Sequence, residues 1–243
     1  MNIKGLKDLW KQAFGDTDEF LEDFFCVAFS EERCATTEED GKIAAMLYWF
    51  DCAWEGKKVA YIYAVATDEA YRNRGLCRAL MESTHQKLQS LGYAGAVLVP
   101  GSLSLFSLYK KLGYTPFCSA LTVTLDADEE GADLAALSHD EYSRRRMPRL
   151  PKDSVVQDDL TFDFLATFCD FYVANDCLFC GSMEEDIFYF QEFLGDPRHV
   201  PGILNALGAK KGTLRMEGDT PFAMYRPLGN TLEMPGHFDI PLN

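Results

Sequence analysis

The chain has 243 residues, which is enough for one large domain or two small ones. Hydrophobic residues make up 47% of it, so we expect a packed core and exclude wholesale disorder. The net charge of −15 argues against nucleic acid as a partner, because phosphate binding needs a basic surface.

The acidic charge is concentrated in the second half of the chain. Residues 1–125 contain 16 acidic and 13 basic side chains (net −3), whereas residues 126–243 contain 22 and 10 (net −12). Such a surface favours a cationic substrate and also keeps a protein soluble. Most of the eight cysteines lie in apolar runs and no apolar leader opens the chain, so we expect reduced thiols and a cytoplasmic location. Cys177-Leu-Phe-Cys180 has no second pair of ligands, so no metal is expected.

Residues 88–109 carry no charge and are long enough to cross a membrane, but glycines, serines and Pro100 interrupt them. We therefore expect no membrane partner.

The hydrophobic periodicity predicts the following elements in chain order. Two short helices open the chain, and a hairpin turns at Asp40-Gly41. A strand over Lys58–Thr67 leads through a glycine-containing loop into a long helix. A short apolar strand over Ala94–Val99, a helix ending at Gly113 and a strand over Thr115–Leu125 follow.

Residues 126–155 change from acidic to basic and contain two prolines, which predicts a linker. The chain is then expected to divide into a domain over residues 1–125, this linker, and a smaller α+β domain over residues 156–243. The order of elements in residues 187–217 is similar to that in residues 60–99. The second domain is therefore open to interpretation as a degenerate copy of half of the first.

The most informative stretch is the loop before the long helix, Arg72-Asn73-Arg74-Gly75-Leu76-Cys77-Arg78. The first N–H groups of a helix are unpaired and carry partial positive charge, so anions bind there. Gly75 lets the backbone approach a phosphate closely, and three arginines add positive charge. The loop therefore predicts a pyrophosphate site, although it is neither a Walker loop nor a dinucleotide-binding turn.

This loop resembles the R/Q-x-x-G-x-G/A signature of the GNAT (Gcn5-related N-acetyltransferase) superfamily. Val65-Ala66-Thr67 is similar to the strand that lines the pantetheine arm of the cofactor, and the segment from Ser102 to Tyr114 resembles the family's second motif. The resemblance covers roughly residues 5–125. More weakly, the two-part layout resembles the Eis (enhanced intracellular survival) type of acetyltransferase.

The resemblance implies an α/β fold with a mixed, mostly antiparallel, splayed sheet flanked by helices. It also implies an N-acetyltransferase that uses acetyl-CoA as cosubstrate and a small-molecule or peptide amine as acceptor. The implied cofactor contacts are Val65, Thr67, Arg72, Asn73, Arg74, Gly75, Leu76, Cys77, Arg78 and Ser102.

The sequence departs from the family pattern at three points. Cys77 stands where Gly or Ala is usual, Ser102 stands where Asn is frequent, and no strand precedes the first helix. These departures leave open a catalytically reduced acyl-CoA-binding regulatory protein. An aminoacyltransferase using aminoacyl-tRNA is a further alternative, which the acidic charge opposes. A homodimer also stays open.

The chemistry needs groups that move protons. An alkylamine with a pKa of about 10.4 is almost fully protonated at pH 7, so a base, a water relay or a lowered amine pKa is required. By resemblance, Tyr109 is the proton donor to the departing thiolate. The four histidines are expected on the surface or in loops. The base stays open among Tyr61, Tyr63, Asp51, Glu69 and a terminal carboxylate on Asn243, the last by analogy with Eis-like enzymes.

Overall fold

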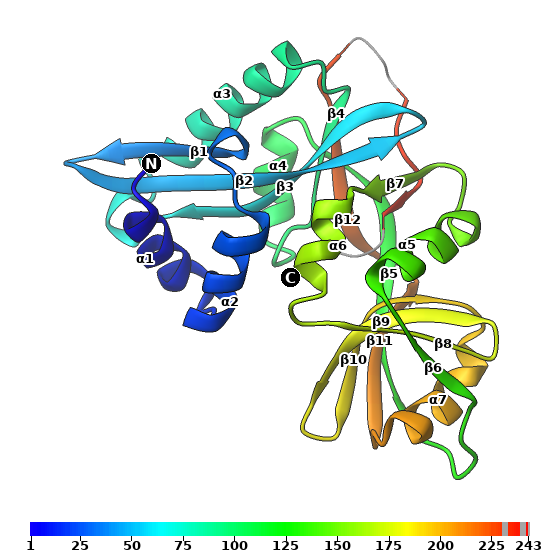
Figure 1. The fold of residues 1–243 in the computed structure, drawn as a ribbon. Coiled ribbons are helices and arrows are strands. Elements are labelled where there is room, and N and C mark those ends of the chain that lie inside the picture. The colour runs from blue at the N-terminus through cyan, green and yellow to red at the C-terminus, as the bar shows by residue number, and fades with distance from the viewer. Residues whose placement is uncertain (230–232, 239–241, 243) are drawn as a thin grey trace.

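A computed structural model describes residues 1–229, 233–238 and 242 of the chain. Across these residues one continuous sheet of 13 strands runs from end to end of the molecule (Figure 1). Its order is β13-β7-β2-β3-β4-β12-β5-β11-β10-β9-β8-β6, and β1 pairs with β2 beside this path.

The N-terminal half follows the predicted order of helices and strands. Its elements are α1 (Ile3–Phe14), α2 (Asp18–Asp23), β1 (Cys34–Glu39), β2 (Lys42–Trp54), β3 (Lys57–Thr67), α3 (Leu76–Ser90), β4 (Gly95–Leu98), α4 (Leu105–Lys111) and β5 (Thr115–Asp126). The opening helices and the hairpin turn at Asp40-Gly41, where both residues have positive φ, are confirmed.

The second half contains more strands than its sequence predicts. Its elements are β6 (Leu134–Leu137), α5 (His139–Arg146), β7 (Ser154–Gln157), α6 (Asp159–Leu165), β8 (Asp170–Ala174), β9 (Cys177–Glu184), β10 (Ile187–Leu194), α7 (Val200–Leu207), β11 (Lys211–Glu217), β12 (Thr220–Pro227) and β13 (His237–Phe238).

The helices cover the two faces of the sheet in distinct groups (Figure 1). On one face, α3 and α4 pack on the central strands, and α7 packs on β5, β10 and β11. On the other face, α1, α2, α5 and α6 enclose a core rich in aromatic rings. An amphipathic stripe explains this for α1, whose Leu6, Leu9 and Trp10 are buried at helical spacing.

The sheet opens between β3 and β4. These strands are parallel and pair only from Val59 to Tyr61 on β3, against Gly95 to Val97 on β4. Beyond Tyr61, β3 continues to Thr67 and contains a bulge opposite β2, where Ala64 has a φ of 51°. A bulge bends its strand, so it separates β3 further from β4. The mixed, splayed sheet flanked by helices is confirmed.

The sheet crosses both boundaries expected between domains. β12, from the far end of the chain, lies between β4 and β5, and β7 pairs with β2. Residues 126–155, expected as a linker, contain β6, α5 and β7. Sequence periodicity cannot show this, because strand order depends on contacts between residues far apart in the chain. The division into domains at residues 125 and 156 therefore stays a prediction. The strand pairing crosses both of these boundaries.

The arginine-rich part of the expected linker is partly buried. The Arg146 guanidinium is 1% exposed and lies 2.8 Å from the buried Glu192 carboxylate on β10. Tyr142 donates to the same carboxylate at 2.7 Å, and Arg146 also donates to Gln157 on β7 at 3.1 Å. A buried charge needs such partners, so this network fixes α5 against β7 and β10.

The second half repeats one arrangement of the first. β10 and β11 are parallel, are connected through α7, and pair only over residues 187–189 and 211–213. β3 and β4 are likewise parallel and connected through α3. This likeness supports the interpretation of a degenerate second copy.

Candidate cofactor and transfer site

The start of α3 follows the splayed part of β3 after a loop that contains a 3-10 helix (Glu69–Tyr71), and it has no side-chain cap. Its N-cap, Gly75, has a φ of 80°, and a Cβ atom added there would have no neighbour within 4 Å. Asn73 also has a positive φ, 64°, so the loop curls before the helix begins. The first N–H groups of α3 are therefore not capped by a side chain, as an anion site requires.

The three arginines of the loop are held mainly by the loop and helix themselves. Arg72 Nε donates to the Thr67 carbonyl at 3.2 Å, and Arg74 Nη2 donates to the Ala70 carbonyl at 3.0 Å. Arg78 pairs with Glu82 one turn further along α3 at 3.0 Å. The side chains of Arg72 and Arg78 remain 50% and 61% exposed. They therefore shape the loop and still present positive charge to solvent.

Three of the predicted site residues come together at the open end of the splay. The Thr67 side chain at the end of β3 lies beside the Cys77 thiol in the first turn of α3. Tyr109 on α4 lies near Cys77 and is 7% exposed. Burial, and secondarily the neighbouring Cys77 thiol, raises the Tyr109 pKa above its usual value. Within the described part of the chain, the Tyr109 hydroxyl forms no hydrogen bond, which leaves it available to a bound molecule.

Of the other predicted cofactor contacts, Val65 and Leu76 lie near Tyr109, whereas Ser102 is exposed. Val65 and Leu76 pack on the same apolar cluster as Tyr109. Ser102 lies in an exposed turn before α4, where its Oγ is 2.8 Å from Ser104 Oγ. No hydrogen bond among the described residues joins Ser102 to Thr67, Cys77 or Tyr109.

Tyr61 and Tyr63 face the aromatic core, on the side of the sheet away from α3. Burial raises the pKa of both phenols. Tyr61 belongs to the last β3–β4 pair before the splay, and its hydroxyl accepts the Leu242 N–H at 3.1 Å. Tyr61 thus lies at the edge of the opening, and Tyr63 lies two residues further along the part of β3 that does not pair with β4. Asn243 lies outside the described residues.

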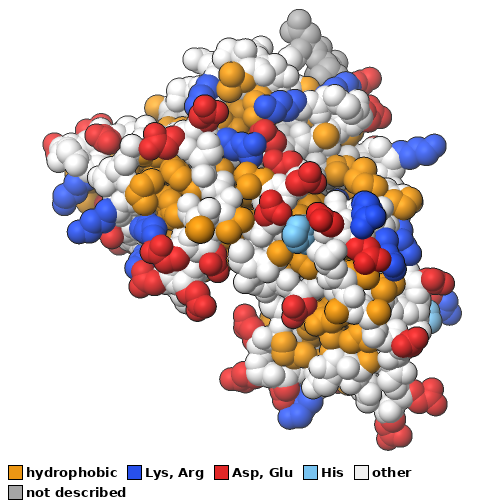
Figure 2. Space-filling view, viewed as in Figure 1, with side chains coloured by type: hydrophobic (Ala, Val, Ile, Leu, Met, Phe, Trp, Pro, Cys, Tyr) orange, Lys and Arg blue, Asp and Glu red, His pale blue; other side chains and the backbone are white. Residues whose placement is uncertain are grey.

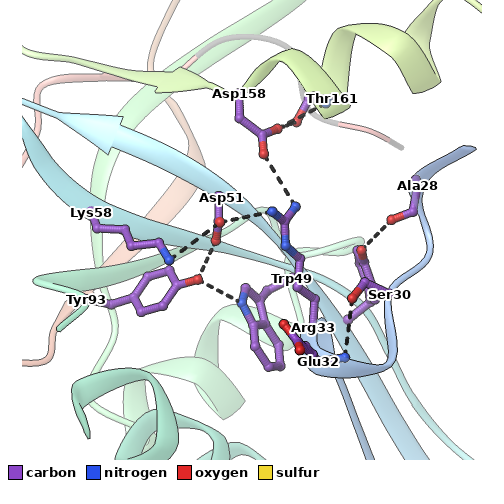
Figure 3. Close-up of polar contacts among 11 residues, drawn as sticks. Ala28, Ser30, Glu32, Arg33, Trp49, Asp51, Lys58, Tyr93, Asp158 and Thr161 are labelled. Carbon is purple, nitrogen blue, oxygen red and sulfur yellow. Dashed lines mark hydrogen bonds and ion pairs between the residues drawn. The ribbon is translucent and has the colours of Figure 1, made fainter. Parts of the chain in front are cut away.

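The carboxylate of Asp51 is held by two cations in a charged cluster near the start of β3 (Figure 3). Arg33 Nη2 lies 3.1 Å from it and Lys58 Nζ lies 3.5 Å away. Tyr93 donates a hydrogen bond to Asp51, and Arg33 also pairs with Asp158, the N-cap of α6, at 3.4 Å. This cluster joins the second half of the chain to β1 and β2. Asp51 therefore has a structural role here, and Glu69, the fourth candidate base, pairs with Arg72 at 3.3 Å.

The expectation that the histidines lie on the surface or in loops is wrong for His85, which is 3% exposed on α3. Its Nδ1 lies 2.8 Å from Arg226 Nη1 on β12, and its Nε2 lies 2.7 Å from Tyr114 Oη. Burial and the nearby Arg226 charge lower the His85 pKa to about 3, so the ring is neutral. Nδ1 then accepts from Arg226, and Nε2–H donates to Tyr114, whose ring packs 5.9 Å from that of Tyr109.

Sequence reasoning missed Arg226 because nothing local marks it. Only the pairing of β12 with β4 and β5 brings it to α3. It also donates to the Leu112 carbonyl at the end of α4 at 2.6 Å, so it fixes the helix that carries Tyr109.

A cavity of about 950 Å³ lies where β5, β11 and β12 meet the end of β10 and the segments around residues 149–153 and 236–238. One of its walls is Phe238, whose ring is 5.0 Å from the Tyr61 ring. The cavity therefore lies next to the candidate base on the face of the sheet away from α3.

A sheet that splays between two parallel strands, with an uncapped helix start after the splay, is the GNAT fold. Residues 2–117, slightly less than half of the chain, match the family model "Acetyltransferase (GNAT) domain". The search of curated proteins found no match.

Several solved structures share the fold. A GCN5-related N-acetyltransferase from Anabaena variabilis is 17% identical, with a TM-score of 0.74 over 94% of this chain and 71% of that one. One from Kribbella flavida is 14% identical, with a TM-score of 0.69 over 93% and 68%. Eis1 from Mycobacterium abscessus is 11% identical, with a TM-score of 0.64 over 93% and 71%.

The described residues contain no helix that is both long and apolar enough to span a membrane. Figure 2 shows acidic side chains over much of the visible face, while Lys and Arg gather over α5.

Proposed function

We propose that the protein is an N-acetyltransferase that moves the acetyl group of acetyl-CoA to the amine of an acceptor molecule. The uncapped start of α3, directly beside the opening between β3 and β4, is the observation that carries this proposal. The GNAT family match over residues 2–117 supports the same class of reaction.

The pyrophosphate of acetyl-CoA would bind the N–H groups at Gly75, Leu76 and Cys77, with Asn73 shaping the loop. Arg72, Arg74 and Arg78 would add positive charge around it. The pantetheine arm would extend along Val65 and Thr67, and its thioester would then lie in the opening beside Tyr109. Ser102, in the exposed turn before α4, would contact the outer part of the cofactor.

The reaction forms a C–N bond and breaks a C–S bond. A neutral acceptor amine attacks the thioester carbonyl carbon, its extra proton leaves to a base or to water, and the CoA thiolate departs and takes up a proton. Tyr61 belongs to the last β3–β4 pair before the opening, and we propose it as a group that orients the amine or a relay water. Its raised pKa means that the phenol stays protonated, so it would act through hydrogen bonds.

Tyr109 would assist the departing thiolate. Its pKa is raised further above that of a thiol by burial, so complete proton transfer is unfavourable, and a hydrogen bond to the developing negative charge is the effective contribution. The hydroxyl has no competing partner among the described residues, which suits this role.

A regulatory protein that binds acyl-CoA without turnover is the second candidate, because Cys77 and Ser102 depart from the family pattern. The start of α3, however, accommodates the cysteine beside Thr67 and has no side-chain cap. Cys52, Cys169, Cys177 and Cys180 are free, buried thiols, which supports a cytoplasmic location.

Isothermal titration with acetyl-CoA tests the proposed cofactor site. We expect the Arg72→Ala/Arg74→Ala variant to bind at least tenfold more weakly, about 1.4 kcal/mol. Arg144→Ala, which removes an exposed arginine on α5, is the matched control and should bind like the wild type. Unchanged affinity in the double variant would show that acetyl-CoA, if bound, is held elsewhere.

A further inference from the structure

The cavity of about 950 Å³ lies at the second place where two parallel strands of the sheet separate. β10 and β11 pair with each other only over residues 187–189 and 211–213, and the ends at which they have separated, near Leu194 and Glu217, line the cavity. Ala120 and Glu217 are paired across β5 and β11 and both line it. The Leu214 side chain is on the opposite face of β11 from that of Glu217, and it belongs to the core beneath α7. The cavity is thus on the face away from α3, α4 and α7.

Two ring contacts connect this cavity with the proposed transfer site. Phe238 is a wall of the cavity and packs against Tyr61 at 5.0 Å. Phe117, a second wall, packs at 6.3 Å against Tyr225, which pairs with Val97 on β4. Val97 in turn pairs with Tyr61 in the last β3–β4 pair before the opening. The cavity is therefore adjacent to the opening, on the face from which an acceptor can approach without displacing the cofactor.

The helix between β10 and β11 lacks one of the free N–H groups that make the start of α3 a candidate phosphate site. α7 begins at Val200 and has Pro201 in its first turn, and proline has no N–H to offer an anion. A second acyl-CoA bound in the same manner is therefore not expected, which leaves this cavity to another ligand.

The lining of the cavity combines aromatic rings with an excess of carboxylates. Four phenylalanines contribute to it: Phe117, Phe193, Phe222 and Phe238. Asp153, Asp176 and Glu217 also line it, and none of these three forms an ion pair among the residues described. Two arginines, Arg149 and Arg215, line it as well, so the carboxylates exceed the guanidinium groups by one. Arg215 stacks over Phe222 at 5.3 Å and donates to the Gln191 carbonyl at 2.7 Å.

Aromatic faces and carboxylates both attract ammonium groups, and the rings also bury an apolar body. A volume near 950 Å³ is within the range of small-molecule sites, roughly 300–1,000 Å³. We infer that this cavity binds the acceptor, and that the acceptor is a small primary amine on an aromatic or other apolar frame without a carboxylate of its own. This inference rests on the proposed function for the reaction, but its binding test does not.

Tryptamine and tryptophan are matched probes, because tryptophan adds a carboxylate to the same frame. We expect tryptamine to bind the CoA-saturated protein at least tenfold more tightly than tryptophan, as measured by calorimetry. The Asp176→Asn/Glu217→Gln variant should reduce this preference at least fivefold, while Glu184→Gln, an exposed carboxylate of the same half outside the cavity, should not.

Filling the cavity supplies a second, independent readout. Ala120→Trp should abolish tryptamine binding, whereas Leu121→Trp, on the opposite face of β5 and already 52% exposed, should leave it intact. Acetyl-CoA affinity should be unchanged in both variants, and this shows that they are folded.

Failure of tryptamine to bind, equal affinity for tryptophan, or binding that survives Ala120→Trp would overturn the inference. If tryptamine binding behaves as expected in all four variants while no acetyl group is transferred to tryptamine, that result would support the cavity as an amine site and would count against the transferase function alone.

Discussion

Arg226 Nη1 lies 2.8 Å from His85 Nδ1, so a strand near the end of the chain is bonded to the helix that follows the loop Arg72–Arg78. The same guanidinium donates to the last turn of α4 through the Leu112 carbonyl. The two helices proposed to bind the cofactor and to carry Tyr109 are therefore both fixed by β12. Cofactor binding and the integrity of the second half of the chain should depend on one another.

The neutral, buried His85 predicts a loss of stability in mild acid. Its pKa is about 3 in the folded protein and near 6.5 when unfolded, so the unfolded state takes up a proton first as pH falls. The stabilisation is complete above pH 6.5 and is lost progressively toward pH 3. Between pH 7 and pH 5 the His85 contribution should fall by about 2 kcal/mol.

Urea unfolding of the wild type and of His85→Gln at both pH values measures this contribution, because the other titrating groups are common to the two proteins. The difference in unfolding free energy between pH 7 and pH 5 should be about 2 kcal/mol smaller in His85→Gln. Equal pH dependence would mean that His85 is accessible or charged in the folded state.

Gly95 at the start of β4 should not tolerate a side chain. A Cβ atom there would lie 2.2 Å from Tyr225 Oη, which is buried against the strand. We expect Gly95→Ala to destabilise the protein by about 3 kcal/mol. Adding Tyr225→Leu removes the colliding ring, so the double variant should lose less than the sum of the two single variants. Additive losses in thermal unfolding would argue against this packing.

A fragment that ends at Leu125 should not fold. It lacks β12, which pairs with β4 on one side and β5 on the other, and it lacks β7, which pairs with β2. Sequence analysis alone would place a complete domain in this fragment. The structure instead predicts no cooperative unfolding transition by circular dichroism and no acetyl-CoA binding. A folded fragment that binds acetyl-CoA would show that β12 is dispensable.

The buried Arg146–Glu192 pair should be sensitive to removal of one partner only. Glu192→Gln leaves the Arg146 charge 1% exposed without its counter-ion, which should destabilise the protein by about 3–5 kcal/mol. Arg145→Gln, which breaks an exposed pair with Glu141 on the same helix, should change stability by less than about 1 kcal/mol. Similar losses in urea unfolding for both variants would contradict the buried role of Arg146.

The sequence predicts the helices of the candidate site better than it predicts how the two halves join. The loop from Arg72 to Arg78 and the motif around Tyr109 are local patterns, because a helix start and a helix stripe are determined by neighbouring residues. The position of β12 depends instead on pairing with strands about one hundred residues earlier. The burial of His85 could not be predicted from its neighbours in the sequence, because its partners Arg226 and Tyr114 are distant in the chain.

The turnover of acetyl-CoA by wild type and Tyr109→Phe tests the central claim most directly. The substitution removes one hydroxyl that has no partner among the described residues, so stability and acetyl-CoA affinity should barely change. With a saturating amine acceptor and chemistry rate-limiting, kcat should fall at least 30-fold, about 2 kcal/mol of barrier. A Tyr109→Phe enzyme with wild-type kcat, or a wild-type protein that binds acetyl-CoA but transfers its acetyl group to no amine, would contradict the account.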